Sequence, residues 1–387
     1  MQTITLSSQK HLFSIPDDIS YINCAYMGPL MKSVEEIGIA AVKRKSQPWT
    51  ISPADFFSDV EILKETFAKL IHCKEAQRIA VIPSASYGLA SAARNVPIKE
   101  GQNIVVVTEQ FPSNIYTWQE LAKEKKATLN FVKPPEGLID RGQLWNEAIL
   151  DSIDENTAVV AIGTVHWADG TLYDLKAIRK ASRNVGALLI VDGSQSVGAL
   201  PFNIEEIQAD ALIVVGYKWL MGPYGTALAY FGAAFDNGKP LEDNWMNRYN
   251  SDDFQGLVAY EPRYKPFANR YNVGETSQFI HVPMLTKSLE QIMEWGVENI
   301  QNYCYELTKG PLEKLVEKGC RIEDRSYTGA HLVGIHLPSE INVEQLKVAM
   351  SERAVNVSFR GTAMRIAPNV YNVAQDFERL LSAFKSV

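Results

Sequence analysis

Residues 188–196 read Leu-Leu-Ile-Val-Asp-Gly-Ser-Gln-Ser, an apolar run that ends in an acid. Residues 211–219 contain a second apolar run, Ala-Leu-Ile-Val-Val, which is followed by Gly-Tyr-Lys-Trp. Apolar runs without alternation are typical of strands buried on both faces, as in a parallel sheet. Ligands of open α/β sheets bind beyond the carboxyl ends of the strands. We therefore expect Asp192 and Lys218, which follow these two strands, to face one crevice.

Outward from this stretch, strand-like runs alternate with helix-like segments, which predicts a doubly wound α/β domain. A long connecting region, rich in Asn, Asp, Tyr and Pro, follows at 235–278. The tail from residue 320 mixes apolar runs and helical patterns, and predicts a smaller α+β domain. We place the large, mainly parallel sheet domain at 18–265 and the C-terminal domain at 266–387, with residues 1–17 as a candidate for packing on the latter. Strands are expected at 79–83, 103–107, 157–165, 187–191, 211–216 and 226–231, and helices at 114–126, 175–184, 282–307, 310–318, 343–353 and 374–385.

The composition limits the function class. The chain has 387 residues, a net charge of -7 and a sequence pI of about 5.5, which argues against nucleic acid as a partner. It has four cysteines and no C-x-x-C pair, so we expect free thiols in the cytoplasm and no metal site. No signal peptide and no membrane-spanning stretch are expected.

An Asp and a Lys at neighbouring strand ends allow two interpretations. They could form a simple ion pair at the sheet edge. Alternatively, a lysine with a lowered pKa forms a Schiff base with an aldehyde cofactor, while a carboxylate keeps a pyridine nitrogen protonated, so that the ring stabilises negative charge at a substrate Cα. The spacing alone leaves both open.

Three separated stretches resemble the signature of the class V aminotransferase family, which includes cysteine desulfurases, selenocysteine lyases, kynureninases and isopenicillin N epimerase. They are Val-Asp-Gly-Ser-Gln-Ser-Val-Gly at 191–198, Ala-Asp-Ala-Leu at 209–212 and Gly-Tyr-Lys-Trp-Leu-Met-Gly-Pro at 216–223. The resemblance extends from Tyr21 to Tyr371. It implies a fold-type-I enzyme that uses pyridoxal 5'-phosphate (PLP), acts on an amino acid and forms a homodimer with shared active sites.

The resemblance implies roles for residues around the cofactor ring. Lys218 matches the Schiff-base lysine, Asp192 the partner of the pyridine nitrogen, and Gln195 the residue that binds the phenolic oxygen. The chain departs from the family where Tyr217 replaces a frequent His and Val215 a frequent Ser. Val215 cannot bind phosphate, so we expect the Tyr217 hydroxyl to take over.

Two segments are candidates for binding the phosphate. Residues 83–88, Pro-Ser-Ala-Ser-Tyr-Gly, lie between a strand and a helical pattern, and the first-turn N–H groups of a helix favour an anion. They resemble the family's phosphate loop, with Ala85 and Ser86 at the contacting positions; the alternative is a plain helix cap by Ser84 or Ser86. Thr276 lies in a segment resembling one that reaches the phosphate of the neighbouring subunit, but it could equally lie in a turn.

Two loops after strand ends resemble family segments near the cofactor. Phe111 stands where desulfurase relatives carry a His that stacks on the pyridine ring, and an aromatic ring there can hold the cofactor; ordinary core packing is the alternative. His166 lies in the segment 164–170 and is the one His that we expect near the site. A catalytic role and a loop His bonded to backbone both remain open for it.

Substrate binding is assigned by resemblance alone. Arg365 matches the arginine that clamps the substrate α-carboxylate, and Arg360 is a second candidate. Asn23 and Tyr26 match an N-terminal segment that folds over the substrate. The alternatives are solvated arginines and turn residues.

The predicted function is a PLP-dependent class V aminotransferase, in which Lys218 binds the cofactor and deprotonates the substrate Cα. A selenocysteine lyase-like β-elimination, an epimerase and a non-enzymatic PLP-binding module are the alternatives. An NAD-dependent enzyme is disfavoured, because no G-x-G-x-x-G follows an early strand. A persulfide-forming desulfurase is also disfavoured, because residues 355–362 contain no Cys, which leaves Cys24 as the one thiol expected near the pocket.

Overall fold

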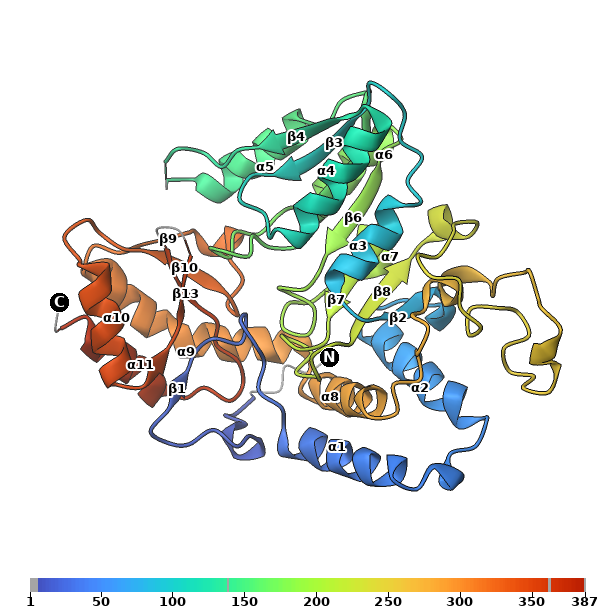
Figure 1. Cartoon of the computed structure of the whole chain (residues 1–387). Helices are drawn as coiled ribbons and strands as arrows, with labels where there is room; N and C mark the ends of the chain where they lie inside the picture. The colour runs from blue at the N-terminus through green and yellow to red at the C-terminus, as the bar shows by residue number, and fades with distance from the viewer. Residues whose placement is uncertain (1–5, 138, 361–362, 386–387) are drawn as a thin grey trace.

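The computed structural model describes residues 6–137, 139–360 and 363–385. Its centre is a seven-stranded sheet of order β2-β8-β7-β6-β5-β3-β4, drawn from cyan to yellow-green in Figure 1. The paired neighbours run parallel, except that β8 is antiparallel to both β7 and β2. The strands are β2 (Ile79–Ile82), β3 (Asn103–Val107), β4 (Thr128–Val132), β5 (Thr157–Gly163), β6 (Leu188–Asp192), β7 (Ala211–Val215) and β8 (Ala227–Phe231).

Both faces of this sheet are covered, which explains the apolar runs of its strands. Along β6, Ile190 packs into the core on one face, whereas Leu189 and Val191 pack into the core on the other. Helices α3 (Ala85–Ala93) and α4 (Ser113–Lys125) contribute to the first core. The second core includes residues of α2 (Asp55–Leu70), α5 (Arg141–Asp151), α6 (Leu175–Asn184), α7 (Ile204–Ile207) and α8 (His281–Trp295).

A separate unit is built from the C-terminal part of the chain (Figure 1). An antiparallel sheet of order β12-β13-β10-β9 packs with α10 (Val343–Glu352) and α11 (Ala374–Ala383). Its strands are β9 (Arg321–Ile322), β10 (Val333–His336), β12 (Ser358–Arg360) and β13 (Ala363–Ile366). Helix α9 (Val297–Glu317) joins the two units, because Ile300 and Cys304 belong to the core beneath the large sheet and Leu312 and Leu315 to the C-terminal core.

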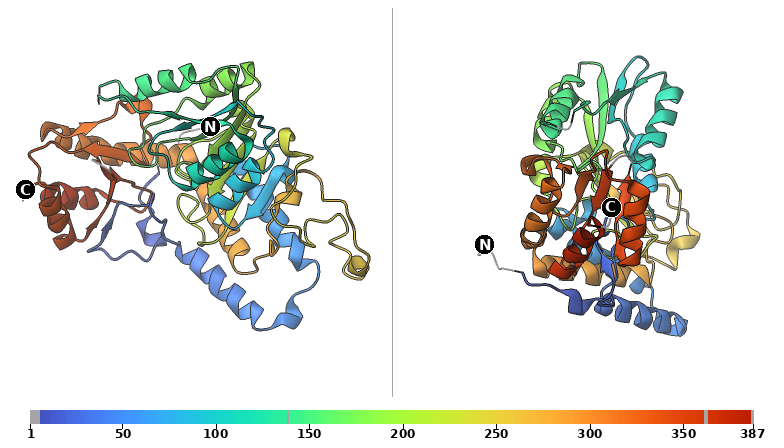
Figure 2. Two further views of the ribbon diagram at one scale, coloured as in Figure 1. Left: turned by 45° about the horizontal axis from the view of Figure 1, so that its top comes forward. Right: turned by 90° about the vertical axis from the view of Figure 1, so that its left-hand side faces the viewer.

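The N-terminal segment contacts the C-terminal unit before it reaches the large one. Strand β1 (Ser20–Tyr21) pairs in parallel with β11 (Val355–Asn356), and Arg379 donates a hydrogen bond to the carbonyl of Asp17. Helix α1 (Lys32–Lys45) then lies along α8 (Figures 1 and 2). Helix α8 also packs against α2. The apolar residues of α8 belong to the core that covers one face of the large sheet. The proposed division at residues 265 and 266 stays a prediction.

Most predicted elements of the large sheet are present to within two residues. Strand β4 and helices α1, α2, α5 and α7 were not predicted. The break predicted at 308–309, between helices at 282–307 and 310–318, is wrong: the chain breaks at Gly296 instead, into α8 and α9. The second of these continues through Pro311. The short 3-10 turns are Lys10–Leu12, Pro48–Thr50, Ala76–Arg78, Ala233–Phe235, Gly256–Val258, Phe267–Tyr271 and Arg325–Tyr327. In the part of the chain that the structure describes, no helix has the length and apolar character needed to cross a membrane.

Candidate active site

A cavity lies at the carboxyl edge of the large sheet. It encloses about 880 Å³ when its open mouth is included, a size suited to a small molecule. Residues that directly follow β2, β3, β5, β6 and β7 line it, together with those that precede the antiparallel β8. The lining residues are Pro83, Ser84, Ala85, Ser86, Gln110, Phe111, Ser113, Gly163, Val165, Trp167, Asp192, Ser194, Gln195, Val215, Tyr217, Lys218, Tyr224, Gly225, Thr226 and Ala227.

Lys218 lies in this cavity, and its side chain is almost fully buried. Its amine stands 5.3 Å from the ring centre of Phe111 and 5.8 Å from that of Tyr217. In the described part of the chain, no ion pair within 4.0 Å joins Lys218 to a carboxylate. The simple ion pair with Asp192 that the sequence left open is therefore not formed.

Burial lowers the pKa of Lys218 from its ordinary 10.5 to about 8. The charge of Asp192 opposes this shift, while Arg365 and Arg360 lower the pKa further. An amine with this pKa is neutral in a much larger fraction at neutral pH than an exposed lysine, so it is a better nucleophile and base.

The backbone around Lys218 is held from below by the N-terminal segment. Gly28 donates its N–H to the carbonyl of Tyr217 at 2.8 Å, and a Cβ at this glycine would lie 2.1 Å from the Lys218 carbonyl oxygen. Only a residue without a side chain permits this approach. Cys24 donates a long hydrogen bond to the same carbonyl at 3.8 Å.

Asp192 and Gln195 both line the cavity, as expected. Asp192 is the last residue of β6, and one of its oxygens accepts the N–H of Ser194 at 3.0 Å. The Gln195 amide donates to the carbonyl of Ala25 at 3.2 Å and accepts from the indole of Trp219 at 3.1 Å. These bonds fix Gln195 at the cavity wall.

Ala85 and Ser86 lie at the start of α3, where Ser84 is the N-cap and accepts the Tyr87 N–H at 3.2 Å. The hydroxyls of Ser84 and Ser86 are 3.0 Å apart. The N-terminus of α3 thus brings first-turn N–H groups and two hydroxyls to one end of the cavity, a combination suited to an anion.

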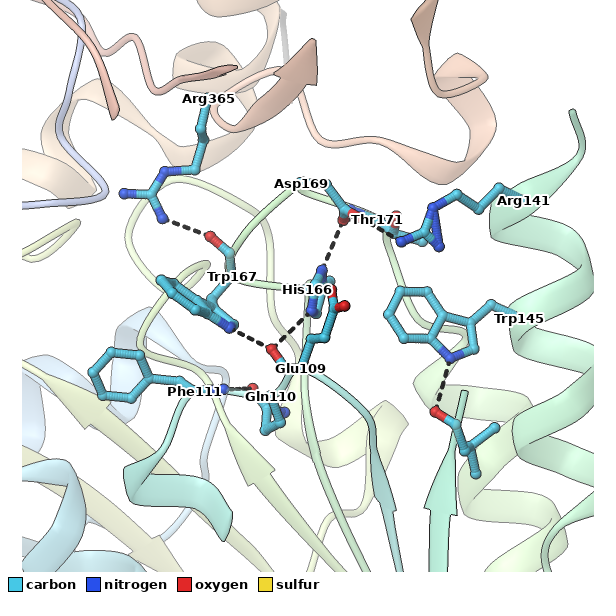
Figure 3. Close-up of polar contacts among 11 residues, drawn as sticks. Glu109, Gln110, Phe111, Arg141, Trp145, His166, Trp167, Asp169, Thr171 and Arg365 are labelled. Carbon is cyan, nitrogen blue, oxygen red and sulfur yellow. Dashed lines mark hydrogen bonds and ion pairs between the residues drawn. The ribbon is translucent and has the colours of Figure 1, made fainter. Parts of the chain in front are cut away.

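Another part of the cavity wall is aromatic. The ring of Phe111 meets that of Trp167 edge-on, with centres 5.4 Å apart, and both line the cavity. Figure 3 shows Trp167 between Phe111 and Arg365. The indole of Trp167 donates to the carbonyl of Glu109 at 2.7 Å. Glu109 has a left-handed backbone with φ of 60°, a strained conformation that tends to occur at functional sites.

His166 lies behind this wall and is not among the cavity-lining residues. Its Nδ1 is 2.9 Å from an oxygen of Asp169, and its Nε2 is 3.2 Å from the Glu109 carbonyl (Figure 3). Asp169 also binds Arg141 at 2.8 Å. Burial would raise the pKa of Asp169, but His166 and Arg141 hold it below its usual range. These contacts are those of a residue that fixes the loop, and a catalytic role for His166 stays a prediction.

Arg365 is buried, with 1% of its surface exposed. It donates one hydrogen bond, from Nη1 to the Trp167 carbonyl at 2.5 Å, while its Nε is buried without a partner. Burial and the charge of Arg360 lower its pKa from 12.5 to about 9. No carboxylate of the described residues pairs with it, so this cation lacks the compensation that a buried charge requires.

The remaining predicted residues lie outside the cavity lining. Asn23 accepts a hydrogen bond from Ser358 at 2.9 Å, Tyr26 is 57% exposed, and Arg360 stands over the Trp167 ring at 5.6 Å. Thr276 is buried, with its hydroxyl bonded to the carbonyl of Val273. The roles assigned to these residues stay predictions.

The sequence analysis did not single out some residues that line the cavity. Gln110 has a buried Nε2 without a partner, and its Oε1 accepts the N–H of Phe111 at 2.8 Å. Tyr224 lies against Tyr217, with ring centres 4.5 Å apart, and Thr226 is 3.1 Å from Nδ1 of His281. Their position after a strand end or a tight turn is the signal that could have identified them.

A family profile described as Aminotransferase class-V matches residues 50–375. The chain belongs to this family. This membership confirms the fold class, the PLP cofactor and the enzymatic nature predicted from the sequence.

Curated relatives of this class-V chain include both aminotransferases and desulfurases. The uncharacterized aminotransferase YcbU of Bacillus subtilis is 25% identical over 83% of this chain and 82% of its own length. A probable cysteine desulfurase of Staphylococcus epidermidis is 26% identical over 84% of this chain and 80% of its own.

Solved structures share the fold at low identity. The cystine C-S lyase C-DES, in complex with its reaction product cysteine persulfide, aligns with a TM-score of 0.82, 17% identity and coverage of 95% of this chain and 97% of that one. The cysteine desulfurase CsdA of Escherichia coli aligns with a TM-score of 0.80, 16% identity and coverage of 97% and 96%.

The residues of the cavity fit PLP. The amine of Lys218 faces the cavity without an acidic partner, Phe111 offers a ring face, and Asp192 supplies a carboxylate at the sheet edge. The start of α3 suits a phosphate, and the orphaned Nε2 of Gln110 is a donor still to be satisfied. Among the described residues, no cluster of side chains could hold a metal ion.

Proposed function

We propose that this chain is an aminotransferase that binds PLP through Lys218 and acts on an amino acid. The observation that carries the proposal is the Lys218 amine, which is buried in the cavity, lacks an acidic partner and has a pKa of about 8. A lysine kept only for structure would pair with a carboxylate or reach solvent.

Bound PLP supplies an electron-withdrawing ring that stabilises the negative charge developing at the substrate Cα. Asp192 would be the carboxylate that keeps the pyridine nitrogen protonated. Once the substrate amine has taken its place on the cofactor, the freed Lys218 amine would take the Cα proton as general base. Arg365 fixes the substrate carboxylate, and the rings of Phe111 and Trp167 shield the reacting atoms from water.

We also propose a cytoplasmic homodimer, in which the turn that carries Thr276 lies near the phosphate bound by the other subunit; the Thr276 hydroxyl, now bonded to the Val273 carbonyl, would have to turn towards that phosphate. An apolar groove between α1 and α8, lined by Ile39, Val42 and Met284 among others, supports such an interface, since Ile39 and Val42 are about half exposed. The four cysteines are all free thiols, as is usual in a reducing compartment.

A persulfide-forming desulfurase is not supported by the thiols of this chain. None of the four cysteines lines the cavity. Cys24, the one expected near the pocket, is fully buried, and burial raises its pKa to about 12. A β-eliminating lyase needs no protein thiol, so that reaction is the second candidate; epimerisation is the third.

Borohydride reduction of the holoenzyme followed by peptide mapping tests the cofactor site. We expect the reduced cofactor on Lys218, and an adduct on another lysine would contradict the proposal. Incubation with a panel of amino acids then separates the reactions. Transamination yields the oxo acid and the amino form of the cofactor. β-Elimination releases the side-chain substituent and yields pyruvate together with ammonia, with the cofactor unchanged, and epimerisation yields the mirror-image amino acid.

A further inference from the structure

Two arginines share one face of the hairpin formed by β12 and β13. In this antiparallel pair, Ser358 lies opposite Arg365 and Arg360 lies opposite Ala363. Because side chains alternate along a strand, Arg360 is on the same face as Ser358 and therefore on the same face as Arg365. The two arginines are diagonal neighbours, within reach of one ligand.

The opposite face of the hairpin is apolar. Met364 is buried in the C-terminal core, and Phe359 packs against that core. The register of the hairpin therefore turns both arginines away from the core of their own unit. Both reach Trp167, since Arg365 binds its carbonyl and the Arg360 guanidinium stands 5.6 Å from its ring centre.

Among the described residues, neither arginine has an acidic partner within 4.0 Å, in contrast to several other inward-lying arginines. Arg141 pairs with Asp169 at 2.8 Å, Arg179 with Asp210 at 2.8 Å and Arg78 with Asp236 at 2.9 Å. The Arg360 side chain is half-buried and donates to the carbonyl of Phe359 at 2.8 Å.

The charges around the site are unbalanced. Lys218, Arg360 and Arg365 are close enough for each arginine to lower the pKa of the lysine, and Asp192 is the acid that opposes them. In the proposed function the cofactor phosphate is bound by the start of α3. A substrate α-carboxylate neutralises Arg365, and the charge of Arg360 is left over.

We propose that the substrate carries a second acidic group, a side-chain carboxylate, which Arg360 binds at the rim of the cavity beside Trp167. This inference rests on the proposed function, because it takes Arg365 as the site of the α-carboxylate. The substrate class is then the amino dicarboxylic acids and their oxo-acid counterparts. A planar guanidinium suits the second carboxylate, because it can offer two parallel N–H groups.

Calorimetric titration of the holoenzyme with two amine-free probes, glutarate and butyrate, tests the proposal without requiring turnover. Glutarate has a carboxylate at each end of its chain, and butyrate has one. We expect glutarate to bind at least about tenfold more tightly, as a charge-assisted pair predicts. The variant Arg360→Gln should bind the two probes alike, with butyrate affinity unchanged. Arg183→Gln, at an exposed arginine on α6, removes the same charge far from the cavity and should keep the preference.

Equal affinity of the wild-type enzyme for the two probes would overturn the proposal. So would a loss of the same size for both probes in Arg360→Gln, because Arg360 would then share the α-carboxylate with Arg365. The variant Arg360→Lys should keep part of the preference. Failure of the proposed function looks different: the purified protein would lack the cofactor on Lys218, or its absorption spectrum would respond to no amino acid.

Discussion

Two buried cations, Lys218 and Arg365, face the same site from different parts of the molecule. Lys218 follows β7 of the large sheet, where Asp192 opposes the lowering of its pKa. Arg365 lies on β13 of the C-terminal sheet, where a second arginine lowers its pKa to about 9. One cation is therefore close to releasing its proton near neutral pH, whereas the other stays charged.

This difference separates two tasks. A neutral amine can attack a carbonyl carbon and accept a proton, so the strand ends of the large sheet suit covalent chemistry. A guanidinium that stays charged and lacks an acid can only recruit an anion, so the hairpin of the C-terminal unit suits substrate recognition. Variants on the two sides should consequently fail in different ways.

The largest effect is expected for Asp192→Asn. The amide cannot hold the pyridine nitrogen protonated, so turnover should fall by about 100-fold or more, as when one preorganised electrostatic group is removed. Turnover per molecule of bound cofactor measures the effect. Asp210→Asn is the matched control, because Asp210 pairs with Arg179 away from the cavity and should influence stability instead. Near-native turnover of Asp192→Asn would show that this carboxylate of the large sheet does not support the reaction.

Arg365→Ala should weaken amino-acid binding by about 2–5 kcal/mol, the cost of losing a buried charged contact. PLP affinity should change much less, because the one hydrogen bond of Arg365 goes to the Trp167 carbonyl and its influence on Lys218 is limited to lowering the pKa of that amine. Titrating the cofactor absorption with an amino acid, and separately the apoenzyme with PLP, compares the two. An equal loss of amino-acid affinity and PLP affinity would mean that cofactor binding and substrate recognition are not separated between the two regions.

The pH dependence of cofactor attachment sharpens the contrast between the cations. With a pKa of about 8, Lys218 gains neutral amine as the pH rises from about 6, is half neutral near pH 8 and almost fully neutral about one pH unit higher. The rate of PLP attachment to the apoenzyme should therefore rise and then level off there. A rate that keeps rising to about pH 10, as for an exposed lysine, would contradict the lowered pKa.

The smallest effect is expected for Cys24→Ser. Because Cys24 is buried under Lys218 and its thiol stays protonated, the variant should keep most turnover and lose a little stability. Incubation with cysteine without reductant, followed by intact mass, should show no added sulfur atom in the wild-type chain. An adduct that Cys24→Ser abolishes would make this thiol a sulfur acceptor.

The sequence predicted the large sheet better than the C-terminal unit for a physical reason. Strands buried on both faces appear as unbroken apolar runs, so β5, β6 and β7 could be recognised, and with them the positions of Asp192 and Lys218. Edge strand β4 is partly exposed along its length and gave no such run. Helices α1 and α2 are amphipathic but carry no strong cap: Met31 and Ala54 precede them.

The arginine pair was beyond prediction from local pattern. Which residues of β12 and β13 share a face depends on a cross-strand register that no single segment encodes. All seven residues that were predicted to contact the cofactor within the same subunit line the cavity. They are Ala85, Ser86, Phe111, Asp192, Gln195, Tyr217 and Lys218. His166 was placed in the right loop, but only the structure shows that its ring points to Asp169 and the Glu109 carbonyl and away from the cavity.

Helix α9 has a mechanical consequence. With 21 residues, this helix is about 30 Å long. One end packs in the core under the large sheet and the other end in the C-terminal core. Pro311 weakens it between these anchors, because proline cannot donate to the preceding turn. A bend of α9 near Pro311 would move the C-terminal unit. The hairpin of β12 and β13, with its two arginines, would then shift relative to Lys218.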